Sequence, residues 1–156
     1  MQNKEKAIEI LVDLIEINNS RALGYEKAAE ACSQIDTDLQ SIFNSVSRDS
    51  KQYAADLVME LAKLGSGESI AGNGNRKMYP VWMDLGASFS GYDRQAILEA
   101  CETAEDNVQK GYNRAFAIAS DFDSKVMMTI INQKAQLKTA HKLIRNYRNA
   151  HWRMTA

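Results

Sequence analysis

Polar residues recur at matching positions in the two halves of this 156-residue chain. Two Gly-Tyr pairs, at 24–25 and 111–112, lie inside breaker-poor segments and indicate an internal repeat. The repeat matches four residues of each half at helical spacing: Asn18, Tyr25, Ser50 and Tyr53 correspond to Glu105, Tyr112, Lys138 and His141. This match places one extra residue in the second half, which we attribute to a change in turn length.

These residue types predict a buried ion pair inside a hydrogen-bonded network. Lys138 can neutralise Glu105, while His141 and the hydroxyl and amide groups of the other matched positions complete the network, because a buried charge is tolerated when it is paired and hydrogen-bonded. The register of the last helix leaves an alternative open, in which Leu137 lies inside and Lys138 lies on the flank.

Four long helices must position this set. Apolar residues recur every three or four positions over about 3–35, 38–64, 93–120 and 124–149. The segment Asp36–Asp38 supplies a turn and an N-cap, Asp93 a second N-cap, and Gly65 a helix end. We therefore expect an all-α, up-down four-helix bundle of two hairpins, forming a single domain over 1–156.

Six of the eight glycines and the one proline fall in the crossover 65–92. Its apolar residues have helical spacing and predict a short helix there: Met78, Val81, Trp82, Leu85 and Phe89. This helix can pack against its own bundle or against a partner subunit.

Composition excludes several classes of protein. Acidic residues interrupt the apolar residues of the N-terminus, so we expect no signal peptide, and no segment is long and apolar enough for membrane insertion. Cys32 and Cys101 are too few for a disulfide framework and fall on apolar helix faces. The plain expectation is a cytoplasmic protein.

Charge is unevenly distributed, although the net charge is −1. The chain from Lys125 onward holds seven basic residues and no acidic one. Such a helix can bind nucleic acid or anionic lipid, or it can complement an acidic neighbouring helix. We favour complementarity, because Glu99, Glu102 and Glu105 lie in the preceding helix, and we expect no nucleic acid partner.

Several segments together resemble the ferritin-like superfamily and, within it, a bacterial four-helix-bundle family of uncharacterised function. They are LIEINN (14–19), GYEKAAE (24–30), residues 81–106, Tyr112 and KTAHKLIRNYRNAH (138–151). The resemblance implies a ferritin-like bundle. In such proteins each hairpin contributes a Glu from its first helix and a Glu-x-x-His from its second, and the two halves hold a di-iron centre.

Carried over to this chain, the di-iron pattern is degenerate. Asn18, Ser50, Tyr53 and Lys138 fall on ligand positions, and only Glu105 and His141 retain ligand-type side chains. We expect a metal-free polar core and no cofactor. The alternative is iron or another divalent metal held by Glu105 and His141, with help from Glu16, Glu26 or Glu102.

No nucleophile or phosphate-loop motif occurs in a usable context. The residues favour a non-enzymatic structural, interaction or stress-related role, although the sequence leaves enzymatic activity open. The alternative is an atypical metal-binding or redox protein of the di-iron carboxylate type. Long amphipathic helices and the aromatic crossover favour a homodimer.

Overall fold

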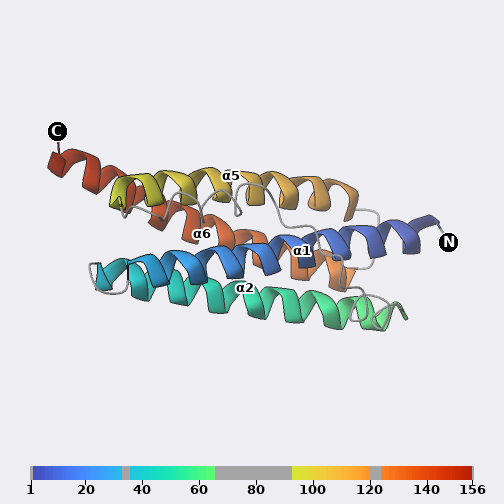
Figure 1. Ribbon diagram of the computed structural model, residues 1–156. Coiled ribbons are helices and arrows are strands. Elements are labelled where there is room, and N and C mark those ends of the chain that lie inside the picture. The colour runs from blue at the N-terminus through green and yellow to red at the C-terminus, as the bar shows by residue number, and fades with distance from the viewer. Residues whose placement is uncertain (1, 33–35, 66–92, 120–123, 156) are drawn as a thin grey trace.

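The computed structural model describes residues 2–32, 36–65, 93–119 and 124–155, which form four long helices. These are α1 (Gln2–Ala31), α2 (Thr37–Lys63), α5 (Arg94–Ala119) and α6 (Ser124–Thr155) (Figure 1). The prediction of an all-α four-helix bundle is confirmed. The helix α6 continues to Thr155, beyond the predicted end at 149, and α1 ends at Ala31 rather than near 35. The expected crossover helix lies outside the described residues.

The helices pair as two antiparallel hairpins that lie against each other. Contacts are most extensive between α1 and α2 and between α5 and α6, and the hairpins meet along α1–α5 and α2–α6. The helix α2 ends at one end of the bundle and α5 begins at the other (Figure 1), so the two hairpins are joined by a crossover between opposite ends of the bundle. A single long crossover of this kind is typical of ferritin-like bundles.

Asp93 and Gly65 lie at helix ends as predicted, whereas Asp36 does not cap α2 with its side chain. Asp93 Oδ1 accepts the backbone N–H of Gln95 at 3.0 Å, as an N-cap does. Gly65 follows α2 with a φ of +82°, which favours glycine. Asp36 precedes α2 without a side-chain cap bond and instead pairs with Arg94 at 2.8 Å, so it joins the first turn to the start of α5.

Burial shows that the two hairpins repeat without an extra residue. Gly24 and Gly111 are 87 positions apart, and the same spacing relates the buried positions of α1 to those of α5 and those of α2 to those of α6. Ser50 therefore corresponds to Leu137, not to Lys138. Leu137 is buried and Lys138 is exposed, so the alternative register holds for the last helix.

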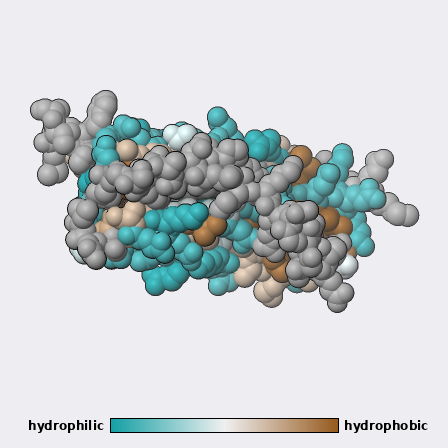
Figure 2. Space-filling model, in the orientation of Figure 1, coloured by the Kyte–Doolittle hydropathy of each residue, from teal (hydrophilic) through white to brown (hydrophobic). Residues whose placement is uncertain are grey.

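The apolar core runs along the bundle axis between all four helices and is interrupted by buried polar side chains. The described part of the face in Figure 2 is mainly hydrophilic, with small separate apolar patches. Within the described residues, no helix has an apolar stretch long enough to cross a membrane.

Gly111 lets α5 approach α1 closely. A Cβ atom on Gly111 would lie 2.6 Å from Cδ1 of the buried Ile17, well inside the optimal carbon–carbon separation of about 3.5–4.0 Å. The glycine thus costs helix propensity but removes a steric conflict between the two hairpins.

We expect Gly111→Ala to be about 1 kcal/mol more favourable to stability in an Ile17→Val background than in the wild-type background. Valine lacks the Cδ1 atom, so the full helix-propensity gain of about 1 kcal/mol becomes available. Chemical denaturation of the four proteins of this double-mutant cycle measures the coupling. Equal effects of Gly111→Ala in both backgrounds would show that the close approach does not require glycine.

Candidate polar core

An ion pair between Arg21 of α1 and Glu105 of α5 lies at the centre of the bundle. The side chains are 1% and 0% exposed. Arg21 Nε donates to Glu105 Oε1 at 2.7 Å, and a terminal guanidinium nitrogen donates to Glu105 Oε2 at 3.2 Å. The other terminal nitrogen of Arg21 donates to Ser50 Oγ at 2.6 Å, and the Tyr25 hydroxyl donates to Glu105 Oε1 at 2.8 Å. Three helices are thus joined through one guanidinium.

A second chain of hydrogen bonds extends from α1 across α5 to α6 and α2. Asn18 Nδ2 donates to the Tyr112 hydroxyl at 2.8 Å, and that hydroxyl donates to Gln133 Oε1 at 2.6 Å. Gln133 Nε2 donates to the backbone carbonyl of Tyr53 at 3.1 Å. Tyr53 in turn donates its hydroxyl to Gln136 at the surface, at 2.8 Å. All four helices therefore contribute side chains to the polar core.

Burial and the Glu105 charge set the ionisation of this core. Burial lowers the pKa of Arg21, but the charge of Glu105, its hydrogen bond to Arg21 and the neighbouring tyrosines together outweigh burial and hold that pKa above its usual value. Burial, followed by the Glu105 charge, raises the pKa of the Tyr25 hydroxyl and of the Cys101 thiol. Near neutral pH these shifts keep Arg21 charged and keep the Tyr25 hydroxyl and the Cys101 thiol neutral.

Six of the eight sequence-predicted residues lie in this core, and two do not. Asn18, Tyr25, Ser50, Tyr53, Glu105 and Tyr112 are buried and take part in the hydrogen bonds above. The expected pairing of Lys138 with Glu105 is not found, because Lys138 is exposed and Arg21 supplies the cation. His141 is buried at the flank, where its Nε2 lies 3.3 Å from Asp106 and 3.4 Å from Arg145.

Two residues of the core were missed in the sequence. Arg21 lies three positions after Asn18 and four before Tyr25, so helical spacing places all three on the same face of α1. Gln133 lies four positions before the buried Leu137 and was hidden by the shifted register of the last helix. The position of Arg21 between Asn18 and Tyr25 on an inner face was the sequence signal that it lies in the polar core.

The donor set does not fit a di-metal centre. Both oxygens of the one central carboxylate, Glu105, bind the Arg21 guanidinium, a fixed cation that repels a divalent ion. The amide oxygen of Asn18 is buried and has no hydrogen-bond donor among the described residues, but one neutral oxygen beside a guanidinium is a poor metal ligand. The described part of the chain has no cluster of three or more His, Cys, Asp or Glu side chains that could hold a metal.

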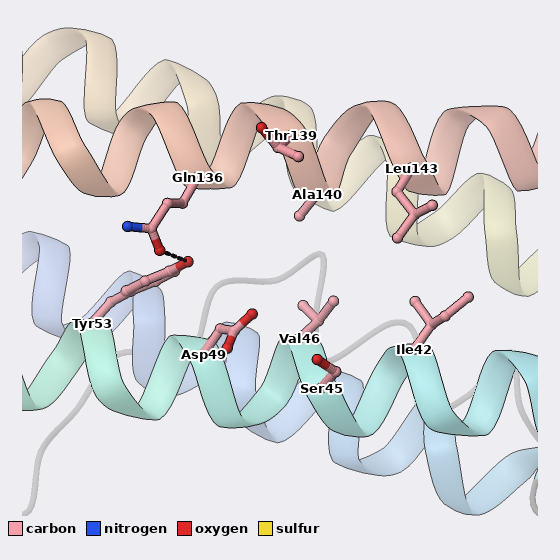
Figure 3. A pocket seen from close by; sticks show the side chains of 9 residues that line it. All are labelled: Ile42, Ser45, Val46, Asp49, Tyr53, Gln136, Thr139, Ala140 and Leu143. Carbon is pink, nitrogen blue, oxygen red and sulfur yellow. Dashed lines mark hydrogen bonds between the residues drawn. The ribbon is translucent and has the colours of Figure 1, made fainter.

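A surface groove of about 380 Å³ separates α2 from α6 next to the polar core (Figure 3). One end is apolar and is formed by Ile42, Val46 and Leu143. At the other end Tyr53 reaches across from α2 and donates a hydrogen bond to Gln136 of α6. Asp49 and Tyr53 are the ionisable side chains among the described residues that line the groove.

Comparisons with known proteins agree with this architecture. Residues 6–117 match the model of a domain family described as a domain of unknown function, DUF2383. Among solved structures, a mutant of Dps1 from Mycobacterium smegmatis superposes with a TM-score of 0.73 at 13% identity, covering 94% of this chain and 97% of that one. A tetragonal form of M. smegmatis Dps superposes with a TM-score of 0.71 at 14% identity, covering 94% and 87%. These similarities confirm the ferritin-like fold. No curated protein sequence matches the chain.

Removing either partner of the central ion pair is expected to destabilise the protein strongly. Arg21→Met leaves the Glu105 carboxylate buried without its cation, and Glu105→Gln leaves a buried guanidinium without its anion. Each change should lower the free energy of unfolding by about 3–5 kcal/mol. The double variant should lose clearly less than the sum of the two, because neither uncompensated charge remains. Urea denaturation of the four proteins measures these values.

A matched control is Arg94→Met, which removes an arginine from the half-exposed pairs with Asp36 and Asp38. This change should cost about 1 kcal/mol or less, because exposed ion pairs contribute little. A loss for Arg21→Met as small as that for Arg94→Met would contradict the central role of the buried pair.

Proposed function

This chain belongs to the DUF2383 family, and we propose that it is a non-enzymatic structural or interaction protein whose ferritin-like bundle is held by a polar core in place of a metal centre. The observation that carries the proposal is the Arg21–Glu105 ion pair. It lies at the middle of the bundle, where the facing helices of ferritin-like metal proteins present their carboxylates.

The chemistry of the neighbouring positions supports the same proposal. The repeat places Asn18 opposite Glu105, so the first hairpin offers a neutral amide where the second offers a carboxylate. The positions of the Glu-x-x-His motif fall on Ser50 and Tyr53 in α2 and, with the spacing of 87 residues, on Leu137 and Ala140 in α6. These four positions offer no carboxylate or imidazole to a metal, and the hydroxyls of Ser50 and Tyr53 are hydrogen-bonded to Arg21 and Gln136.

The structural role also agrees with how closely the central ion pair is surrounded by its own partners. Glu105 accepts from Arg21 and Tyr25, and Arg21 donates to both Glu105 and Ser50. A site built for substrate would leave some of these donors or acceptors facing a cavity. Here they are directed at one another, so their contribution is to the register and specificity of helix packing.

The alternative function, an atypical metal-binding or redox protein, is separated from this proposal by metal loading. The full-length protein is purified, incubated with Fe²⁺, Mn²⁺ or Zn²⁺, desalted and analysed for metal. We expect no stoichiometric, tightly bound metal, because the central carboxylate is already neutralised by Arg21. The same measurement on Glu105→Gln and His141→Ala identifies any site that does bind.

Stoichiometric retention of one metal that is abolished by Glu105→Gln would overturn the structural proposal in favour of a central metal site. Retention abolished by His141→Ala alone would equally overturn it and would place the metal on the flank of α6. Metal content that is substoichiometric and unchanged in both variants agrees with the structural role.

We also propose that the protein forms a homodimer. Large apolar side chains remain exposed on the described helices, among them Met59 of α2 and Met128 of α6, at 62% and 54% exposure. Met59 and Thr129 line one surface hollow, so Met128 lies at the same end of the bundle. We expect light scattering to give twice the chain mass of 17.5 kDa, and a species of 17.5 kDa at all concentrations would refute the dimer.

A further inference from the structure

A second polar site lies on the outside of the bundle, between α5 and α6. It is a pocket of about 320 Å³, which is within the range of about 300–1,000 Å³ typical of small-molecule sites. The α6 side is basic, with Lys134, Lys138 and Lys142 four residues apart along one face. The α5 side contributes the neutral amides of Gln109 and Asn113.

The three lysines have no carboxylate partner among the described residues. The ammonium of Lys134 lies 4.9 Å from the centre of the Phe116 ring, and Lys138 and Lys142 are exposed. Three cations on one helix face repel one another, and this repulsion is relieved when an anion binds between them. The pocket therefore carries an excess of positive charge that no carboxylate of the described residues balances.

The carboxylates near this pocket are already engaged. Asp106 of α5 lies 3.3 Å from His141, which lines the pocket from α6. Glu102 accepts from Arg145 at 3.0 Å and also pairs with Arg148. The acidic side chains of α5 thus pair with α6 through Arg145, Arg148 and His141. The three lysines take no part in this pairing.

Gln109 supplies an independent sign of a ligand. Its side-chain amide nitrogen is buried and has no acceptor among the described residues, although Gln109 lines the pocket. A buried N–H group without an acceptor costs about 1–3 kcal/mol, so native structures rarely retain one without a reason. An anion oxygen in the pocket would provide the missing acceptor.

We propose that the α5–α6 pocket is a binding site for a phosphate group, carried by a small molecule or by a lipid headgroup. The ammonium groups of Lys134, Lys138 and Lys142 supply the charge, and the amide N–H groups of Gln109 and Asn113 supply directed hydrogen bonds to phosphoryl oxygens. Lysine is a common phosphate ligand because its compact charge has three donors. This site is separate from the Arg21–Glu105 core and does not depend on the role proposed for that core.

The test is calorimetric titration of the full-length protein with inorganic pyrophosphate at low ionic strength. We expect saturable binding at one site per chain. Replacing two pocket lysines, in the variant Lys138→Gln with Lys142→Gln, should weaken binding by at least about tenfold. The matched control, Lys27→Gln with Lys110→Gln, removes the same charge from two exposed lysines outside the pocket and should keep the affinity within about twofold.

A single substitution tests the geometry rather than the charge. Gln109→Leu keeps the shape of the side chain but removes the unpaired N–H group, so it should weaken pyrophosphate binding about threefold or more while leaving the unliganded protein equally or more stable. In the wild type, the side-chain amide resonances of Gln109 should shift during the titration. No shift, together with unchanged affinity in Gln109→Leu, would overturn the proposed geometry.

The remaining outcomes decide between sources of the phosphate and chance attraction. Binding of phosphatidic acid vesicles without binding of pyrophosphate, lost with the same two lysines, would support the site and identify a lipid headgroup as its ligand. An equal loss in the control variant would overturn the proposal, because net charge alone would then explain binding. Failure of both pyrophosphate and vesicles to bind would also overturn it.

Discussion

The bundle depends on one buried ion pair that only a complete set of partners makes tolerable. Moving a guanidinium and a carboxylate out of water costs several kcal/mol for each ion, and their attraction repays this only with good geometry and full hydrogen bonding. Arg21 and Glu105 meet both conditions, because the guanidinium bonds both carboxylate oxygens and Ser50, and Tyr25 completes Glu105. The pair therefore fixes how α1, α2 and α5 are aligned along the bundle axis more than it adds to net stability.

The two halves of the chain contribute unequally to this arrangement. The spacing of 87 residues places Arg21 of the first hairpin at the position of Val108 in the second, and Asn18 at that of Glu105. A symmetric pair of hairpins would have presented two carboxylates or two arginines at the centre, each needing a counterion. One cation from the first hairpin and one anion from the second satisfy each other, so the asymmetry makes a metal-free core possible.

Helical periodicity was sufficient to predict the fold, because long helices with few breakers repeat their inner face every three or four residues. It also identified most of the core residues, since Asn18, Tyr25, Glu105 and Tyr112 lie on inner faces of long uninterrupted helices. The last helix was misaligned by one residue, which in an α-helix rotates a side chain by about 100°. This rotation moved Lys138 inward in the prediction, whereas Leu137 occupies the core. Arg21 and Glu105 are 84 positions apart in the sequence and lie on different helices. No local sequence pattern specifies which cation reaches a given carboxylate across such a distance.

The charge of α6 follows from the same local rule as the core. A helix facing an acidic neighbour was expected to be neutralised by it, but neutralisation acts between individual side chains within a few ångströms of each other. Glu102 engages Arg145 and Arg148, and Asp106 engages His141, so these two acidic side chains of α5 have partners in α6. The lysines at 134, 138 and 142 instead line the outer pocket, where α5 contributes the amides of Gln109 and Asn113. A net charge of −1 for the whole chain is therefore compatible with a strongly positive pocket. The buried ion pair and the outer lysines are too far apart in their environments to be explained by one charge balance, because each charge interacts mainly with its immediate neighbours.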